Sequence, residues 1–345
     1  MDIIDYKVLT KFSEIDKPEW SAFITNHPQG TVFQTPQMIE FYQVSQNLEP
    51  VVVACYDLHN HLAGIMVAVI QKEHDGFVGS FSARSIIWGG PLVKNNEPAL
   101  ITLLLRHYDQ IIKKKAVFSQ FRNFYDVLPL INVYTEMGYR YEDWLNLLVE
   151  TVDEEETFKS ISKSKRRQIK KGKSGNVQLV EPESLDDVRE FYEILKSLYR
   201  LKVKKPLPSW SFFENFYHFS KEGKLGKYLM IKNNGKVIGG IMCAITPYKT
   251  IYEWYITGMD IAYKDLYPSV MATYFAIDYA LKNKLSFLNF MGAGSPNEAY
   301  GVREFKTKFG GELVNYGRFT KIHRPFIMSV SRLLFYFWAN RKLST

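Results

Sequence analysis

A glycine-containing loop near the end of the sequence is the first candidate for a functional site. The segment SFLNF (286–290) is typical of a short buried strand, and it leads directly into Gly292 and Gly294. Glycine allows a sharp turn of the backbone and a close approach by a ligand. We therefore expect Gly292 and Gly294 to line a substrate-binding loop.

A basic turn follows this loop and contains the residue best suited to chemistry. Phe305 and Phe309 are four residues apart, so they are expected to anchor one face of a helical turn. Lys306 would then project towards solvent or a ligand, where its charge could stabilise a carbonyl oxyanion or a donor phosphate. Arg303 and Phe305 are further candidates for binding substrate, and ELVNYGRF (312–319) predicts a returning strand. The alternative is a surface loop with solvated lysines.

The positive charge of the chain is concentrated in one segment. The net charge is +8, and residues 159–173 contain eight of the 44 Lys and Arg residues and no acid, which leaves 36 basic against 36 acidic residues elsewhere. This concentration predicts a negatively charged partner. The alternative is a solubilising face. We expect a helix that is broken at Gly172. The candidate phosphate-binding residues are Lys163, Lys165, Arg166, Arg167, Lys170 and Lys171.

Length and composition limit the classes of protein to consider. A chain of 345 residues predicts two domains. We expect a cytoplasmic protein, because no secretory signal or membrane span is apparent and Cys55 and Cys243 lie in apolar runs. No Cys/His cluster has metal-site spacing, so we expect no metal and no bound cofactor.

Internal similarity predicts a duplicated architecture. LAGIMVAVI (62–70) resembles IGGIMCAIT (238–246), and each is the second arm of a hairpin. Each is followed by a strand that ends in glycine, then a helix and a short strand with phenylalanine. We predict an α/β fold with two tandem lobes, each a mixed β-sheet flanked by helices. The expected boundaries are 1–150, 151–320 with the active site, and a basic, apolar C-terminal helix at 321–345.

The C-terminal segment suggests contact with a membrane surface. Ile327, Val330, Leu334 and Phe337 recur at helical spacing, with basic residues around them. This pattern favours a helix that lies in the interface on the inner face of the cell membrane. The alternative is a helix that packs on the protein itself.

Several motifs together resemble the Fem family of aminoacyltransferases that build peptidoglycan bridges. They are FQTPQM (33–38), WGGPLV (88–93), SKSKRRQIKKGKSGNVQLV (162–180), NFMGAGSP (289–296) and YGVREFKTKFGGELVNYGRF (300–319). The resemblance implies two lobes of the GNAT acyltransferase fold. It also implies transfer of an aminoacyl group from aminoacyl-tRNA, as co-substrate, to an amine on a lipid-linked muropeptide. The Phe305-Lys306 pair matches a Phe-Lys pair of the family.

The sequence leaves the acyl donor open between two classes. It lacks the long helical hairpin that some family members use to grip tRNA. The alternative is an acyl-CoA-dependent N-acyltransferase that acts on an amino sugar or another cell-envelope amine. Such enzymes usually hold the pyrophosphate on a glycine-rich loop, whereas MDIAYKDLYPSV (259–270) has no glycine. A non-catalytic binding protein is the second alternative.

Acyl transfer to an amine also requires a route for the amine proton. Glu253 and Asp260 flank the predicted strand that ends at Gly258, and both are candidate proton acceptors. Tyr255 and Tyr263 are candidates for positioning the substrate, and a structural role is the alternative for all four residues. No pattern of a nucleophile with its base is present, so no covalent intermediate is expected.

Overall fold

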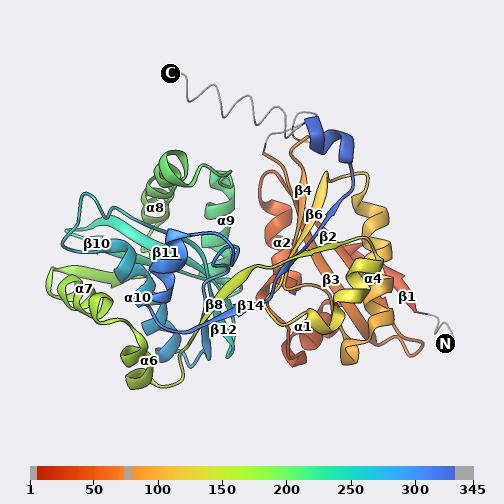
Figure 1. The fold of residues 1–345 in the computed structure, drawn as a ribbon, viewed down its shortest axis with the longest axis horizontal. Coiled ribbons are helices and arrows are strands. Elements are labelled where there is room, and N and C mark those ends of the chain that lie inside the picture. The colour runs from red at the N-terminus through yellow and green to blue at the C-terminus, as the bar shows by residue number, and fades with distance from the viewer. Residues whose placement is uncertain (1–5, 74–78, 80, 331–345) are drawn as a thin grey trace. The chain divides into compact units, whose positions relative to one another are not determined.

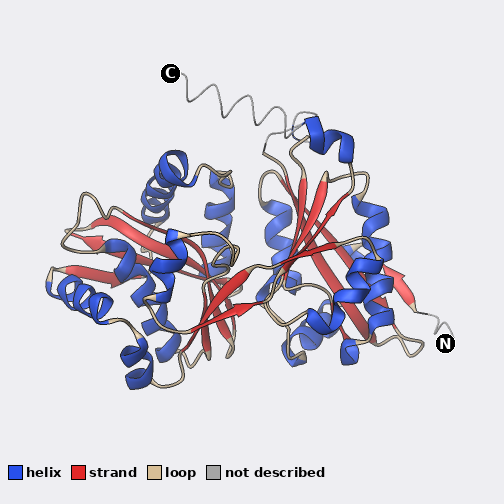
Figure 2. Cartoon of the chain, in the orientation of Figure 1, coloured by secondary structure: helices blue, strands red, loops and turns tan. Residues whose placement is uncertain are grey.

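The computed structural model describes residues 6–73, 79 and 81–330. The chain divides into two compact units, which are residues 1–143 with 316–345, and residues 144–315 (Figure 1). Each unit contains a mixed β-sheet flanked by helices (Figure 2). The predicted α/β architecture of two tandem lobes is confirmed.

The first unit is built on a sheet with the strand order β1-β2-β3-β4-β6-β15-β7, and β5 pairs with β3. Its strands are β1 (Lys7–Leu9), β2 (Leu48–Tyr56), β3 (Leu62–Gln71), β4 (Arg84–Trp88), β5 (Leu92–Val93), β6 (Phe118–Arg122), β7 (Arg140–Glu142) and β15 (Arg318–Ile322). Its helices are α1 (Lys17–Asn26), α2 (Pro36–Val44), α4 (Pro98–Ile112) and α5 (Ile131–Glu136).

Alternation along β2 explains why helices cover both faces of this sheet. Val51, Val53 and Cys55 pack into one apolar cluster with α4, whereas Val52 and Ala54 pack into another with α1 and α2. Successive side chains of a strand point to opposite faces, so an uninterrupted apolar run requires a cover on each side.

The second unit has the strand order β14-β8-β13-β12-β11-β10-β9. Its strands are β8 (Leu145–Glu150), β9 (Val177–Val180), β10 (Gly226–Asn233), β11 (Lys236–Thr246), β12 (Thr250–Gly258), β13 (Phe287–Asn289) and β14 (Glu312–Asn315). Its helices are α6 (Glu154–Ser160), α7 (Lys163–Ser174), α8 (Leu185–Leu198), α9 (Trp210–Lys221), α10 (Pro268–Lys282) and α11 (Gly301–Thr307).

The predicted repeat corresponds to a shared topology. In the first unit, antiparallel β3 and β4 lead through α4 to β6, which is parallel to β4. In the second unit, antiparallel β11 and β12 lead through α10 to β13, which is parallel to β12. The same order of elements therefore occurs twice along the chain.

The boundaries between the units differ from those expected at 150/151 and 320/321. The strand β8 precedes residue 151 but pairs with β13 and β14 of the second sheet. The strand β15 pairs with β6 and β7 of the first sheet. The predicted returning strand 312–319 is wrong as a single strand, because the chain passes between the two sheets at residues 316–317.

The C-terminal segment begins as a strand. Lys321 lies in β15, where its ammonium donates to Asp109 Oδ2 at 2.6 Å. Residues 325–330 are helical, and the part of the predicted C-terminal helix from 331 to 345 lies outside the described residues. The membrane interpretation of this segment therefore stays a prediction.

Candidate active site

The parallel strands β12 and β13, at the centre of the second sheet, diverge after a short paired stretch. The corresponding strands of the first unit do not diverge. In the first unit, β4 and β6 stay paired over all five residues of each strand. In the second unit, β12 and β13 pair only from Thr250 with Phe287 to Tyr252 with Asn289, although β12 continues to Gly258. The backbone groups that follow Asn289 therefore need partners other than β12.

Lys306 on α11 is the partner of two of these groups. Its ammonium donates to the carbonyl oxygens of Phe290, at 2.7 Å, and Gly292, at 3.1 Å. It also lies 3.3 Å from Glu253 Oε1 on β12. Lys306 is buried, so it does not project freely into solvent, and its predicted contact with a ligand stays a prediction.

Glu253 is the acidic partner in this pair and is more deeply buried than Lys306. Burial raises the pKa of Glu253 above its ordinary value, and the adjacent Lys306 ammonium opposes this shift. Glu253 Oε2 is buried and has no hydrogen-bond partner among the described residues. The side chain of Lys306 is 11% exposed and that of Glu253 is 3% exposed. An approaching substrate can therefore reach Lys306 more readily than Glu253.

The glycine loop is fixed by a residue that the sequence reasoning missed. Asn146 on β8 is buried, and its Oδ1 accepts hydrogen bonds from the backbone N–H groups of Gly292, at 3.0 Å, and Leu147, at 2.9 Å. The available signal was a single amide side chain inside the apolar run WLNLLVE (144–150). A buried polar side chain in such a run generally has a defined partner.

Arg303 and Gly294 also shape the loop. The Arg303 guanidinium donates to the carbonyl oxygens of Ala293, Ser295 and Glu298. Gly294 has a φ of +82°, and a Cβ there would lie 2.9 Å from the ring of Tyr300. Both residues therefore hold the loop in shape, and their predicted binding of substrate stays a prediction.

The basic helix α7 joins this region through Lys165. Lys165 is 7% exposed, and its ammonium lies over the rings of Phe305, at 4.1 Å, and Phe309, at 5.4 Å. Burial lowers the pKa of Lys165 to about 8, and the positive charge of Lys308 acts in the same direction. Lys165 therefore does not belong to the exposed cations with which it was grouped. It links α7 to the segment that carries Lys306.

Asp260 has a structural partner in the second unit. Its two carboxylate oxygens accept hydrogen bonds from the backbone N–H of Ser269, at 3.0 Å, and from the Ser269 hydroxyl, at 2.5 Å. Ser269 is in the first turn of α10, directly after Pro268. Asp260 thus places a negative charge at the N-terminus of α10. This contact gives Asp260 a capping role, and we do not include it in the proposed chemistry.

The two predicted substrate tyrosines lie in different surroundings. Tyr255 packs in an aromatic cluster with Phe212 and Phe213 of α9. Tyr263 is partly buried against the apolar core that contains α10.

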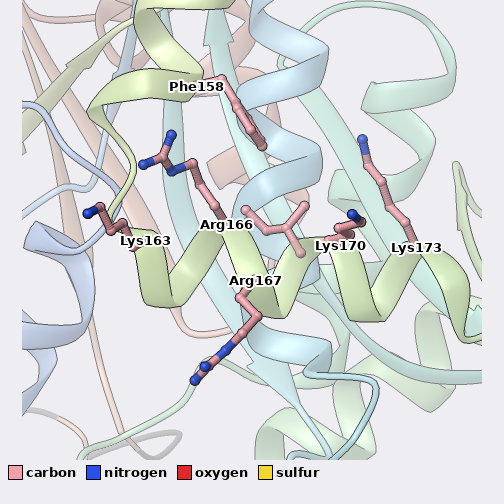
Figure 3. A pocket seen from close by; sticks show the side chains of 7 residues that line it. Phe158, Lys163, Arg166, Arg167, Lys170 and Lys173 are labelled. Carbon is pink, nitrogen blue, oxygen red and sulfur yellow. The ribbon is translucent and has the colours of Figure 1, made fainter.

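The outer surface of α7 carries unpaired positive charge around a hollow. The helix is continuous through Gly172, so the predicted break is wrong. A Cβ at Gly172 would lie 2.4 Å from Met271 Sδ, which shows how closely α7 packs on α10. A hollow of about 640 Å³ is lined by Phe158, Ile169, Lys173 and four further cations. These cations, here called the basic stripe, are Lys163, Arg166, Arg167 and Lys170 (Figure 3).

The basic stripe has no acidic partner within ion-pair distance among the described residues. Its members follow helical spacing along one side of α7, while Lys165 is buried on the other side. Lys171 is exposed outside the hollow.

Within residues 6–73, 79 and 81–330, no cluster of His, Cys, Asp or Glu could hold a metal ion. The helices of this part of the chain are too short or too polar to cross a membrane.

Comparison with known proteins supports the resemblance drawn from the sequence. Residues 221–335, which include β10 to β15 with α10 and α11, match the model of the FemAB family. The resemblance to the Fem family is confirmed. The crystal structure of FemX is similar, with a TM-score of 0.70 and 13% identity, over 94% of this chain and 99% of that one. No curated protein matches the sequence.

Two further solved structures share the two-lobe fold. The C-terminal domain of a putative lysylphosphatidylglycerol synthetase from Agrobacterium fabrum has a TM-score of 0.57 and 10% identity, over 91% of this chain and 93% of that one. A tandem GNAT protein from the clavulanic acid biosynthesis pathway also has a TM-score of 0.57, with 8% identity, over 92% of this chain and 99% of that one. At these identities the similarity establishes the tandem GNAT-like fold.

Proposed function

We propose that this FemAB-like protein is an acyltransferase that forms an amide on an amine acceptor, with aminoacyl-tRNA as the donor. The observation that carries this proposal is the link between the basic stripe and the Lys306 site. Lys165 of α7 contacts Phe305 and Phe309, which flank Lys306 in sequence. A donor whose phosphates bind α7 would therefore lie beside the segment that carries Lys306.

Phosphate binding favours RNA over acyl-CoA as the donor. The basic stripe offers several cations without acidic partners, and phosphate contacts supply most of the sequence-independent affinity for nucleic acid. A GNAT enzyme that uses acyl-CoA generally needs free N–H groups at the helix that follows its parted strand. Here that helix is α10, and Asp260 already occupies the N–H of Ser269. A pyrophosphate there would meet a carboxylate of the same charge.

We assign Lys306 to the reacting carbonyl. The acceptor amine attacks the ester carbonyl of the donor, a C–N bond forms, and the C–O bond to the ribose breaks. The proton lost by the amine balances the one gained by the ribose oxygen. Lys306 is the group that stabilises the oxyanion, because its ammonium lies beside the parted strands; one of its three N–H groups, now directed to Phe290, Gly292 and Glu253, would turn to the substrate. Glu253 is a positioning residue, because it acts through Lys306.

The acceptor is an amine on a lipid-linked muropeptide, and the C-terminal segment favours its encounter at the membrane. The similarity to FemX and to a putative lysylphosphatidylglycerol synthetase supports an aminoacyl group and a cell-envelope acceptor. We propose a cytoplasmic protein with a peripheral contact at the inner face of the membrane through the apolar, basic residues that follow β15.

Direct transfer assays test this function. The purified chain is given radiolabelled aminoacyl-tRNA or acetyl-CoA, together with a muropeptide amine, and the labelled amide is measured. We expect transfer from aminoacyl-tRNA. Transfer from acetyl-CoA alone would overturn the choice of donor, and no transfer from either donor would favour a binding protein.

Two lysines on the same segment provide a matched test of the site. Replacing Lys306 by Met should lower kcat by roughly 100- to 1000-fold, the usual effect of losing one oxyanion donor. Replacing the exposed Lys308 by Met removes the same charge two residues away and should leave kcat unchanged. Equal rates for the two variants would contradict the role of Lys306.

A further inference from the structure

We propose that the hollow on α7 holds an unpaired base of the donor RNA, stacked on Phe158. This inference rests on the proposed donor and adds a recognition element to it. Phe158 belongs to the last turn of α6, and its ring extends over α7 into the hollow (Figure 3). Bases of single-stranded nucleic acid commonly stack on an aromatic ring while cations track the phosphates.

The position of Phe158 is fixed by the connection between α6 and α7. Ile161 is buried between these helices, and the backbone N–H of Ser162 donates to the carbonyl oxygen of Lys308 at 2.9 Å. The side chain of Phe158 is 40% exposed, whereas a phenylalanine in a hydrophobic core is buried. Buried Ile169 completes an apolar floor beneath it. The Phe158 ring is thus held in place while part of its surface stays accessible to a ligand.

The surrounding charge has the arrangement that a short single strand requires. From Lys163 to Lys170 the basic stripe spans about 10 Å, at ~1.5 Å per residue along the helix. This distance suits about three stacked nucleotides at ~3.4 Å each. Lys173 also lines the hollow, but its ammonium is bonded to the Tyr274 hydroxyl at 2.6 Å. The cations left for phosphates are therefore those of the stripe.

The apolar lining of the hollow argues against the two other polyanions that a basic helix attracts. A blunt duplex presents only its phosphates to such a face and makes no use of an apolar floor. Insertion into an anionic membrane requires apolar groups that protrude beyond the cations, whereas Phe158 and Ile169 line a hollow between them. An unpaired base uses both the floor and the charges.

The test compares two RNA hairpins with the same number of phosphates, one with a four-nucleotide unpaired 3′ end and one blunt. We expect the full-length protein to bind the tailed hairpin about 10-fold more tightly, and Phe158→Ala to remove this preference. Phe158→Trp should retain the preference and report stacking by fluorescence quenching. Arg167→Glu, by contrast, should weaken binding of both hairpins and lower the dependence on salt.

Three results would overturn the inference in distinguishable ways. Equal affinity of both hairpins for the wild type and for Phe158→Ala would reject base stacking and leave the phosphate site of the proposed function intact. Absence of RNA binding by the wild type would reject the proposed donor as well. Sedimentation with vesicles of anionic phospholipid that depends on Phe158 would assign the hollow to a membrane surface.

Discussion

Replacing Lys306 by Met should open the loop that follows β13. The change keeps most of the side-chain volume but removes the donors to the carbonyl oxygens of Phe290 and Gly292. It also leaves Glu253 buried without its cation. Breaking a buried ion pair from one side generally costs about 3–5 kcal/mol. Protonation of Glu253 relieves part of this cost, so we expect a loss of about 3 kcal/mol in the free energy of local opening.

Hydrogen exchange measures this loss at defined backbone groups. The N–H of Gly292 donates to Asn146 Oδ1, and the N–H of Ala293 donates to the carbonyl oxygen of Leu145. A loss of about 3 kcal/mol corresponds to exchange roughly 100-fold faster in peptides that cover residues 287–294, because 1.4 kcal/mol is a factor of ten. Peptides from β2 in the first unit serve as the internal control and should not change.

The effect should also depend on pH in a defined direction. Burial already raises the pKa of Glu253, and removal of Lys306 takes away the charge that opposes this shift. A carboxyl group with a raised folded-state pKa favours folding below its unfolded pKa, and this contribution is lost as pH rises through the folded-state pKa. The penalty in Lys306→Met should therefore grow as pH rises above the ordinary pKa of a glutamate.

A second substitution tests whether Glu253 is the cause. Glu253→Gln in the Lys306→Met background removes the titrating group, so the penalty should become independent of pH. Protection of residues 287–294 that is unchanged by Lys306→Met at every pH would refute the reasoning. A pH-dependent penalty that persists in the double variant would assign the titration to another group.

Three further predictions follow from the second unit and the C-terminal segment. Gly172→Ala should lower the melting temperature, at a cost of about 1–3 kcal/mol, because its Cβ would overlap Met271 Sδ. The stability of the wild type should rise with pH between about 8 and 10.5, because the pKa of Lys165 is lower in the folded chain, and denaturant titrations should show that Lys165→Met removes this rise. A chain that ends at Val330 should keep its fold but lose sedimentation with anionic vesicles, whereas one that ends at Thr320 should be destabilised because it cuts β15.

The sequence predicted the architecture well where the signals are local. An apolar run with side chains for both faces marks β2. The pair Thr35-Pro36 begins α2, with the Thr35 hydroxyl accepting from the backbone N–H of Met38. The repeat was visible because its hairpins, helices and strands keep their order. Pairing between distant strands was not visible, because nothing local in β8 or β15 shows which sheet each joins.

The candidate site was found in sequence but its geometry was not. Lys306 and Glu253 were both selected, yet their ion pair depends on where β13 ends and on the end of α11 at Thr307. Lys165 was grouped with exposed cations because charge alone does not reveal which side of a helix is buried. Asp260 is bonded to Ser269, nine residues later, and that contact depends on the turn before α10.

The return of β15 to the first sheet has a consequence for the order of folding during synthesis. The second unit is one continuous segment, residues 144–315, so all of its strands emerge from the ribosome before β15 does. The first sheet lacks the strand between β6 and β7 until residues 318–322 emerge, and β6 meanwhile presents an unpaired edge. Although domains usually complete folding from the N-terminus onwards, the N-terminal unit of this chain is completed last.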